Sequence, residues 1–255
     1  MDLILDPHVL LALGAIALAA GFIDTLAGGG GLITVPAMLL MQVPPVQAIA
    51  TNKLQGSFGT LVSTLTLLRK RQLNWEDVKA ACLSSFIGAS LGAVLIQFID
   101  ASVLDLLVPV VLLSIALYFL LAPTAGAVES KPRMGDRLYR LCVVPIIGCY
   151  DGFFGPGTGS FFSLAEVALR GRNLVRATAS AKGMNLASNI ASLIVFILGG
   201  KVLWTLGLMM ALGQMAGAYL GSMALIAGGA RLIRPLIVIV CFAMIGRYCY
   251  QNLYL

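Results

Sequence analysis

The chain has 255 residues, of which 59% are hydrophobic and 11% are charged, and its mean hydropathy is +0.96. Soluble domains carry about a quarter charged residues, so this composition excludes a soluble protein and predicts an integral membrane protein. The formal net charge is +6, but most lysines and arginines lie in short links between apolar segments. This distribution is typical of cytoplasmic loops and excludes nucleic acid as a partner.

About ten apolar segments follow one another, which predicts an all-α fold. The first is interpreted as a retained membrane helix and not as a signal peptide, because Asp2 and Asp6 stand where a signal has basic residues. Two segments of about twelve residues are too short to cross about 30 Å of hydrocarbon. The longer segments cover 9–26, 46–68, 78–99, 102–121, 138–153, 174–199, 202–227 and 231–251, and the short ones cover 31–42 and 158–169.

The two halves of the chain carry the same pattern, which predicts an internal repeat. "GFIDTLAGGGG" aligns with "GCYDGFFGPGTG" and matches Asp24 to Asp151, while "VQAIATNKL" aligns with "VRATASAKG" and matches Lys53 to Lys182. Each half has five segments, and an odd number of crossings predicts that the second half enters the membrane from the opposite side. The predicted units are a first repeat at 1–121, a cytoplasmic linker at 122–137 and a second repeat at 138–255.

Loop charge predicts the same inverted topology. Basic loops follow the third segment of the first half but the second and fourth segments of the second half. The positive-inside rule then places these loops and the linker inside and both termini outside. Re-entrant short segments, with four crossings in each half, are the less favoured alternative. The basic residues are Arg69, Lys70 and Arg71, then Lys131, Arg133 and Arg137, and finally Arg170, Arg172, Arg176, Arg231 and Arg234.

Each short segment follows a glycine-rich loop. Glycine permits left-handed backbone, and a helix N-terminus presents N–H groups at its positive end, so the paired loops predict an anion site near the membrane midplane. The alternative is that these glycines only allow close helix packing. The loops consist of Gly28, Gly29, Gly30 and Gly31 in the first half and of Gly155, Pro156, Gly157, Thr158 and Gly159 in the second. Pro156 and Thr158 break the pattern, so the two sites need not be equivalent.

Two lysines lie deep in predicted helices. Lys53 and Lys182 are about seven or eight residues from the helix start, roughly 10–12 Å deep. A charge at that depth costs roughly 2.5–3.5 kcal/mol, so it faces a cavity, a partner or a substrate. Asn185 and Asn189 share one helical face with Lys182, and Asn52 stands beside Lys53. These five side chains are predicted to bind the anion, with a structural ion pair and interhelical hydrogen bonds as the alternatives.

Asp24 and Asp151 each precede a glycine loop by four residues. We expect each carboxylate to form a structural ion pair with a lysine, and the alternative is that it carries a coupling proton. Glu166 lies four residues before Arg170, a spacing that predicts an ordinary helix ion pair. Gln214 is a polar residue without a predicted role. Glycines four apart predict close helix packing at Gly88 and Gly92, and at Gly213, Gly217 and Gly221.

The sequence contains no catalytic motif. It has one histidine and no HExxH, GxSxG or Walker pattern, and its five cysteines show no CxxC spacing. No enzymatic activity, metal site or cofactor is therefore predicted.

The stretches "GFIDTLAGGGGLITVPA", "ATNKL" and "DGFFGPGTGSF" resemble the signature regions of the TauE/SafE family of sulfite exporter-like permeases. The resemblance covers essentially the whole chain. It implies a bacterial inner-membrane transporter for small sulfur-containing or carboxylate anions, such as sulfite or sulfonates. The matched positions are Asp24, Gly28 to Gly31, Asn52, Lys53, Asp151, Gly155, Gly157, Gly159 and Lys182.

Three functions are compatible with these features. The favoured one is a secondary transporter that works by alternating access, with protons as a candidate coupling ion. The alternatives are a passive anion channel and a membrane-embedded accessory protein without flux of its own.

Overall fold

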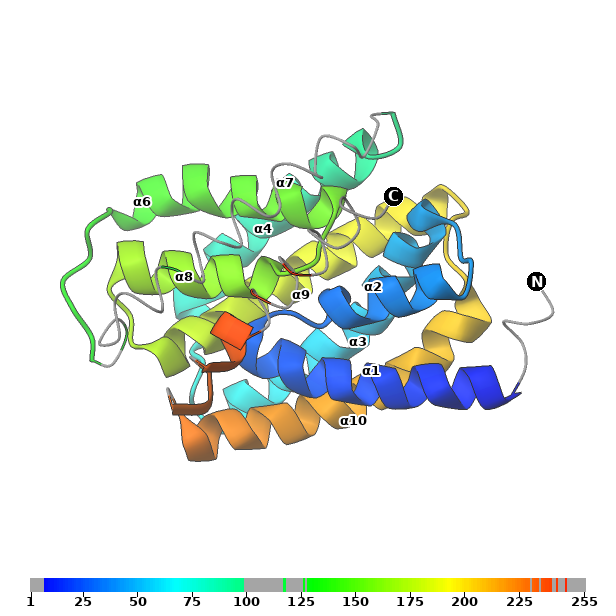
Figure 1. The fold of residues 1–255 in the computed structure, drawn as a ribbon. Coiled ribbons are helices and arrows are strands. Elements are labelled where there is room, and N and C mark those ends of the chain that lie inside the picture. Colours follow the sequence, from blue (N-terminus) through cyan, green and yellow to red (C-terminus); the bar gives the residue numbers. More distant parts are fainter. Residues whose placement is uncertain are drawn as a thin grey trace.

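The computed structural model describes residues 7–98 and 128–229, most of 231–239, and the isolated positions 117, 126, 242 and 246. Within these residues the only regular secondary structure is helical (Figure 1). The predicted segment 102–121, apart from residue 117, lies outside the described residues, as does most of the predicted segment 231–251 beyond residue 239. Residues 1–6 and 251–255, which bear on the placement of the two termini, also lie outside them.

Every predicted segment before residue 99 and between 138 and 227 is confirmed as a helix. Two short elements, α6 (Asp136–Leu138) and the π-helical turn η2 (Tyr139–Val143), lead directly into α7. The longer elements are α1 (Pro7–Ala27), α2 (Gly31–Leu40), α3 (Pro45–Arg69), α4 (Trp75–Leu95), α7 (Val144–Phe153), α8 (Thr158–Arg170), α9 (Leu174–Leu198) and α10 (Trp204–Gly228).

The two short helices begin at glycine-rich loops, as predicted. α2 has 10 residues and α8 has 13, so at 1.5 Å per residue they measure about 15 and 20 Å and cannot cross about 30 Å of hydrocarbon. Left-handed backbone at Gly28 (φ 73°) interrupts the helical path before α2, and left-handed backbone at Gly157 (φ 85°) does so before α8. These are conformations that residues with a Cβ rarely adopt.

Two parallel helix pairs form the sides of the bundle. α10 packs on α1 through Gly213, Gly217 and Gly221, where an added Cβ would collide with the α1 backbone. α4 packs on α7 in the same way, since a Cβ at Gly88 or Gly92 would collide with the α7 backbone. The close packing predicted from the glycine spacing is therefore confirmed.

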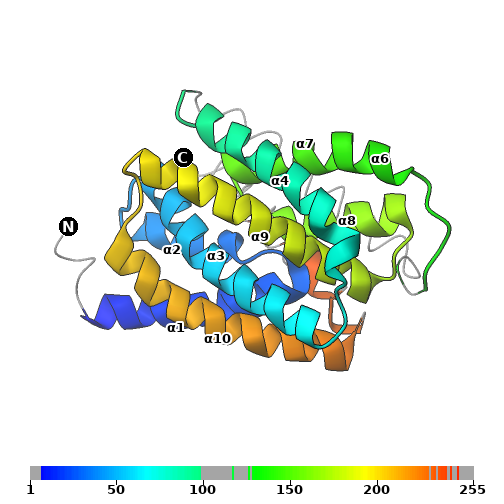
Figure 2. The ribbon, with the colours of Figure 1, turned by 180° about the vertical axis from the view of Figure 1, so that it is seen from behind.

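The middle of the bundle is formed by α3 and α9, which pack on each other. α3 also packs on α10, and α9 also packs on α4 (Figure 2). α1 and α7 run in opposite directions across the molecule (Figure 1). The centre of the molecule is therefore enclosed by elements from both halves of the chain.

Within the described residues, α1, α4, α9 and α10 are long and apolar enough to cross a membrane by length and composition. Their outward faces carry apolar side chains at helical spacing. On α4, for example, Leu83, Ile87 and Leu91 are 62%, 53% and 60% exposed. Such stripes suit contact with lipid hydrocarbon, whereas most polar side chains of α3 and α9 are buried inside the bundle.

Candidate functional site

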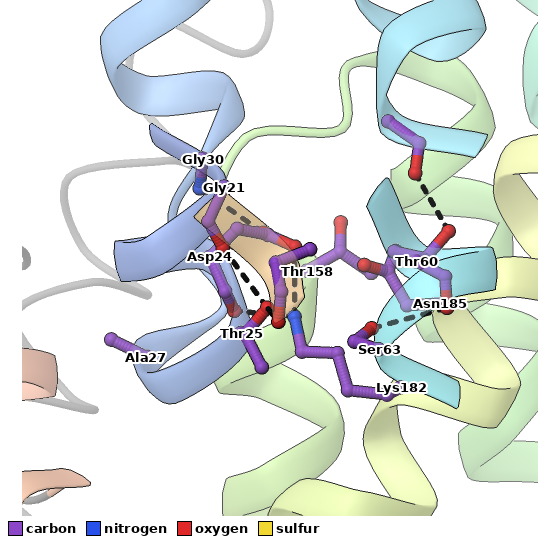
Figure 3. Close-up of polar contacts among 12 residues, drawn as sticks. Gly21, Asp24, Thr25, Ala27, Gly30, Thr60, Ser63, Thr158, Lys182 and Asn185 are labelled. Carbon is purple, nitrogen blue, oxygen red and sulfur yellow. Dashed lines mark hydrogen bonds and ion pairs between the residues drawn. The ribbon is translucent and has the colours of Figure 1, made fainter. Parts of the chain in front are cut away.

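Two buried ion pairs connect the halves of the chain. Lys53 Nζ on α3 lies 2.8 Å from Asp151 Oδ1 on α7, and Lys182 Nζ on α9 lies 2.9 Å from Asp24 Oδ2 on α1. Figure 3 shows Lys182 extending from its helix toward Asp24. Both lysine side chains are 1% exposed. Each lysine is thus paired with the carboxylate of the opposite half, so the ion pairs weighed as an alternative role are present.

Asp24 also holds the start of α2. Its Oδ1 accepts a hydrogen bond of 3.1 Å from the backbone N–H of Gly30 (Figure 3), while Lys182 donates to both the backbone oxygen and Oδ2 of Asp24. A carboxylate at this place satisfies an N–H group at the positive end of a helix. The Asp24 carboxylate therefore already satisfies one of the N–H groups at the start of α2, where the anion site was predicted.

The start of α8 is held by neutral groups. Thr158 Oγ1 donates to the carbonyl oxygen of Gly155 at 2.6 Å, and the Tyr150 hydroxyl donates to the carbonyl oxygen of Pro156 at 2.7 Å. Pro156 and Thr158 are the positions where the second loop departs from the first. The two helix N-termini are therefore built differently, in line with the departure seen in the sequence.

The two glycine loops touch each other. A Cβ atom at Gly28 would overlap the backbone of Gly159 and Ser160, and a Cβ at Gly159 would lie 2.5 Å from the Cα of Gly28. Ser160 Oγ also donates to the carbonyl oxygen of Ala27. The loops thus cross at the centre of the molecule with backbone against backbone, a contact that only glycine allows at these positions.

A small central cavity lies at this crossing. The space in it that is open to the centres of water-sized molecules is about 20 Å³, roughly what one water molecule needs. It is lined by Asp24, Gly28, Gly31, Asn52, Lys53, Gly56, Asp151, Gly155, Gly157, Gly159, Asn185, Asn189 and Gln214.

Most of the predicted site residues meet at this cavity, but not all of them. Lys182 pairs with Asp24 without lining the cavity, and Gly29, Gly30 and Thr158 belong to the loops without lining it. Only one of the two predicted lysines is therefore in direct contact with the central space.

The asparagines present amide groups to the cavity. Asn52 Oδ1 accepts from Thr34 Oγ1 at 2.7 Å and from Gln55 Nε2 at 3.1 Å, which leaves its NH₂ group beside Gly31. Asn185 Nδ2 lies 3.5 Å from Asp151 Oδ2. Because Gly31 is in the first turn of α2, where N–H groups lack an intrahelical acceptor, this wall of the cavity offers hydrogen-bond donors.

Two lining residues were not predicted to belong to the site. Gly56 lies one helical turn after Lys53 and faces Asn189, since an added Cβ would lie 3.5 Å from Asn189 Oδ1. Gln214 reaches the cavity from α10. Gln214 carried a signal in the sequence, because a buried amide in an apolar membrane helix is costly unless it faces a partner or a cavity.

The ion pair predicted between Glu166 and Arg170 is wrong. Glu166 Oε2 lies 3.1 Å from Arg172 Nε instead, while Arg170 pairs with Asp136 at 3.2 Å. The reason is the left-handed turn at Gly171 (φ 68°), which ends α8 and directs the chain back, so that the Arg172 N–H also donates to the Glu166 carbonyl oxygen.

A second, larger cavity of about 450 Å³ lies at one end of the bundle. Arg71 from the α3–α4 loop, Ser130 from the stretch before α6, and Arg172 from the α8–α9 loop all line it. Three predicted cytoplasmic segments therefore meet at the same end of the molecule.

Comparisons with known proteins identify the family of the chain. The family described as "Sulfite exporter TauE/SafE" matches residues 13–248. A "Probable membrane transporter protein" of Haemophilus influenzae is 46% identical over 252 residues, covering 99% of this chain and 98% of that protein. The "Probable membrane transporter protein YfcA" of Escherichia coli K12 is 43% identical over 247 residues, covering 97% of this chain and 92% of that protein. No solved structure matches the chain significantly.

A third relative, "Probable membrane transporter protein ORF9" of a Sinorhizobium species, is 47% identical over 237 residues, covering 93% of this chain and 91% of that protein. The family match spans nearly the whole chain, and these relatives are aligned along almost their full length. The resemblance seen in the two signature regions is thereby confirmed, and the chain belongs to the TauE/SafE sulfite exporter family of membrane transporters.

Proposed function

We propose that the protein is a secondary transporter that carries small, sulfur-containing anions such as sulfite or sulfonates through the central cavity by alternating access. The observation that carries this proposal is the crossing of two glycine loops beside a buried lysine. Helix N-termini, amide groups and Lys53 converge there, and together they are suited to bind oxyanions. The family to which the chain belongs is described as an exporter, and this description gives no support to an enzymatic function.

Alternating access requires the helices around the cavity to move. A sulfite or sulfonate group has four or more heavy atoms, whereas the cavity offers about 20 Å³ to the centres of water-sized molecules. The helices must therefore separate on one side before such an anion can enter. The loops touch through glycine backbone and through the hydrogen bond from Ser160 to Ala27, so they can part while the close packing within the α1–α10 and α4–α7 pairs stays intact.

The proposal includes an inverted repeat. Three features support it: the matched sequence motifs, the equivalent parallel pairs α1–α10 and α4–α7, and the opposite directions of α1 and α7 (Figure 1). With the basic end of the bundle in the cytoplasm, both termini lie outside a bacterial inner membrane. To test this, each of Gln42 and Arg71 is replaced by cysteine in a cysteine-free chain. An impermeant thiol reagent added outside should label Q42C and spare R71C, and the reverse result would overturn the topology.

The charges around the site support a proposal of proton coupling. Lys53, Lys182, Asp24 and Asp151 sum to no net charge, so an incoming anion must compete with a carboxylate for its lysine. A carboxylate that loses its lysine inside the bundle would be a buried, unpaired charge, and binding a proton removes that cost. We therefore propose that the anion and a proton move together, with Asp151, the partner of Lys53, as the proton carrier.

The experiment is uptake by purified protein in liposomes. A panel of sulfite, thiosulfate, sulfonates and small carboxylates is offered with and without an inward proton gradient. A transporter gives saturable uptake that the gradient accelerates. Current without saturation would indicate the passive channel, and a complete lack of flux would favour the accessory protein.

A matched variant separates transport from folding. In Lys53→Gln/Asp151→Asn both partners become neutral amides of similar size, so no unpaired charge is left in the bundle. We expect this protein to insert and purify like the wild type and to lose proton-dependent uptake. Wild-type uptake by the double variant would contradict the assigned roles of both residues.

A further inference from the structure

Gln214 is a polar side chain at the cavity without a role in the ion pairs. It is 3% exposed and lines the central space from α10. Its amide oxygen Oε1 has no hydrogen-bond partner within the described part of the chain. Buried polar atoms are nearly always hydrogen-bonded, so an unpaired acceptor at the wall of a cavity can accept a hydrogen bond from a molecule that enters that cavity.

The equivalent position in the other helix pair holds a different residue. Gly21 on α1 packs against the carbonyl oxygen of Gln214, and Gly148, its sequence match on α7, packs against the carbonyl oxygen of Ser85. Ser85 Oγ donates to the Met184 carbonyl oxygen at 2.8 Å and does not line the cavity. The two pairs therefore share their backbone packing, but only α10 places a long polar side chain at the centre.

The neighbouring helix makes room for this side chain. A Cβ at Gly59 on α3 would lie 2.5 Å from the Cγ of Gln214. At the same spacing after the lysine of α9 stands Ser188, whose hydroxyl donates to the Asn185 carbonyl oxygen at 3.0 Å. A glycine of α3 thus faces a glutamine of α10, while serines hold both of the matching positions on α9 and α4. This difference makes the wall of the cavity polar on the α10 side.

We propose that Gln214 is a specificity-determining residue whose amide oxygen accepts a hydrogen bond from a donor group on the transported anion. This inference rests on the proposed transport function. The helix N-termini and Lys53 are suited to bind anionic oxygens, whereas Gln214 offers an acceptor, which a fully deprotonated oxyanion cannot use. The favoured substrate class is a monoanion that also carries a hydroxyl, an amino N–H or a protonated oxygen.

Two sulfonates of equal charge and similar size test this selectivity. 2-Hydroxyethanesulfonate carries a hydroxyl donor, and in 1-propanesulfonate a methyl group replaces that hydroxyl. In liposomes, the wild type should transport the hydroxy compound with a kcat/KM about tenfold higher, the value of one hydrogen bond to a buried amide. In Gln214→Leu, which keeps similar volume without the amide, the ratio should fall to about one.

Two further variants keep the result interpretable. Gln214→Ser introduces the residue found at the equivalent position of α4 and should lose the preference in the same way. It provides the test if the leucine variant inserts poorly into the membrane. Ser85→Ala is the matched control, because Ser85 lies outside the cavity, and it should keep the wild-type ratio.

The outcomes separate this inference from the proposed function. If wild type shows no preference, or if both Gln214 variants retain it, Gln214 does not determine specificity, while uptake of either sulfonate still supports a transporter. If the wild type takes up neither these sulfonates nor any other anion of the panel, the transport function fails and the inference fails with it.

Discussion

The two buried ion pairs occupy matching places in the sequence, yet the structure supports them differently. Lys53 lies beside Gly155, lines the cavity and has the Asp151 carboxylate as its partner, and that carboxylate is 2% exposed. Lys182 does not line the cavity and binds both the backbone oxygen and the carboxylate of Asp24. The Asp24 side chain is 13% exposed and also accepts from the Gly30 N–H.

This difference indicates a division of roles within a repeated motif. The Lys182–Asp24 pair fixes the glycine loop and the start of α2, because it includes two backbone groups. The Asp24 carboxylate accepts from the Gly30 N–H, and the Asp24 backbone oxygen accepts from Lys182. Within the described part of the chain, the Lys53–Asp151 pair joins side chains alone, so an anion can replace one partner without unfolding a loop. Lys53 is therefore the lysine that we expect to meet the anion, and Lys182 the one that maintains the site.

The largest expected effect is that of Lys53→Gln. This change leaves Asp151 as a buried charge whose remaining close neighbour is Asn185 Nδ2 at 3.5 Å. Removing one partner of a buried ion pair costs about 3–5 kcal/mol. We expect that loss in the free energy of unfolding, measured by denaturant titration in detergent.

The double variant Lys53→Gln/Asp151→Asn is the control for this prediction. It should recover most of the lost free energy of unfolding, since it leaves no unpaired charge. Equal losses in the single and double variants would mean that the ion pair is not the cause.

Gly28→Ala disrupts the contact between the two glycine loops, where Gly28 packs against Gly159. Left-handed backbone costs alanine about 1–2 kcal/mol, and overlap with the backbone of Gly159 and Ser160 adds about 1–3 kcal/mol. We expect a total loss of about 2–5 kcal/mol in the free energy of unfolding, together with loss of uptake. Gly135→Ala is the control, because nothing lies within 4 Å of the added Cβ, and stability losses of equal size in both variants would refute the crossing as the cause.

The sequence was sufficient to predict the helices of the described residues and most residues of the cavity. The motif around Asp24 and Lys53 recurs around Asp151 and Lys182, and its glycines and buried charges are costly in a membrane unless they serve a site. The residue types and their repetition therefore carried the information. The lengths of the two short helices followed from the spacing of the glycines and the next polar loops.

Three features depended on tertiary contacts that no local pattern contains. Pairing of each lysine with the opposite half requires the position of α3 relative to α7, and of α9 relative to α1, to be known. Gln214 faces the cavity because Gly59 on another helix leaves space for it. The partner of Glu166 is Arg172 because the chain reverses at Gly171. In each case, contacts between distant segments decided which of several suitable groups became neighbours.

Asp24→Asn tests the supporting role of the Lys182–Asp24 pair. The asparagine oxygen can still accept from the Gly30 N–H, and Lys182 keeps its bond to the backbone oxygen at residue 24. The variant thus loses one charge-assisted interaction, which is worth about 1.5–3 kcal/mol. The loss in the free energy of unfolding should be smaller than that of Lys53→Gln in the same denaturant titration. A larger loss would reverse the assignment of the supporting pair.

The smallest effect is expected for Glu76→Gln, which gives the baseline for both buried pairs. Glu76 pairs with Lys79 at the start of α4, but the two side chains are 69% and 51% exposed. Solvent screens the attraction in such a pair, and the entropy lost when both side chains are ordered offsets most of the rest. The Glu76–Lys79 pair therefore contributes at most about 0.5 kcal/mol. Uptake should stay at the wild-type level, and the free energy of unfolding should fall by no more than that amount. A loss comparable to that of Asp24→Asn would show that removing any carboxylate destabilises this protein, and the distinction between buried and exposed pairs would fail.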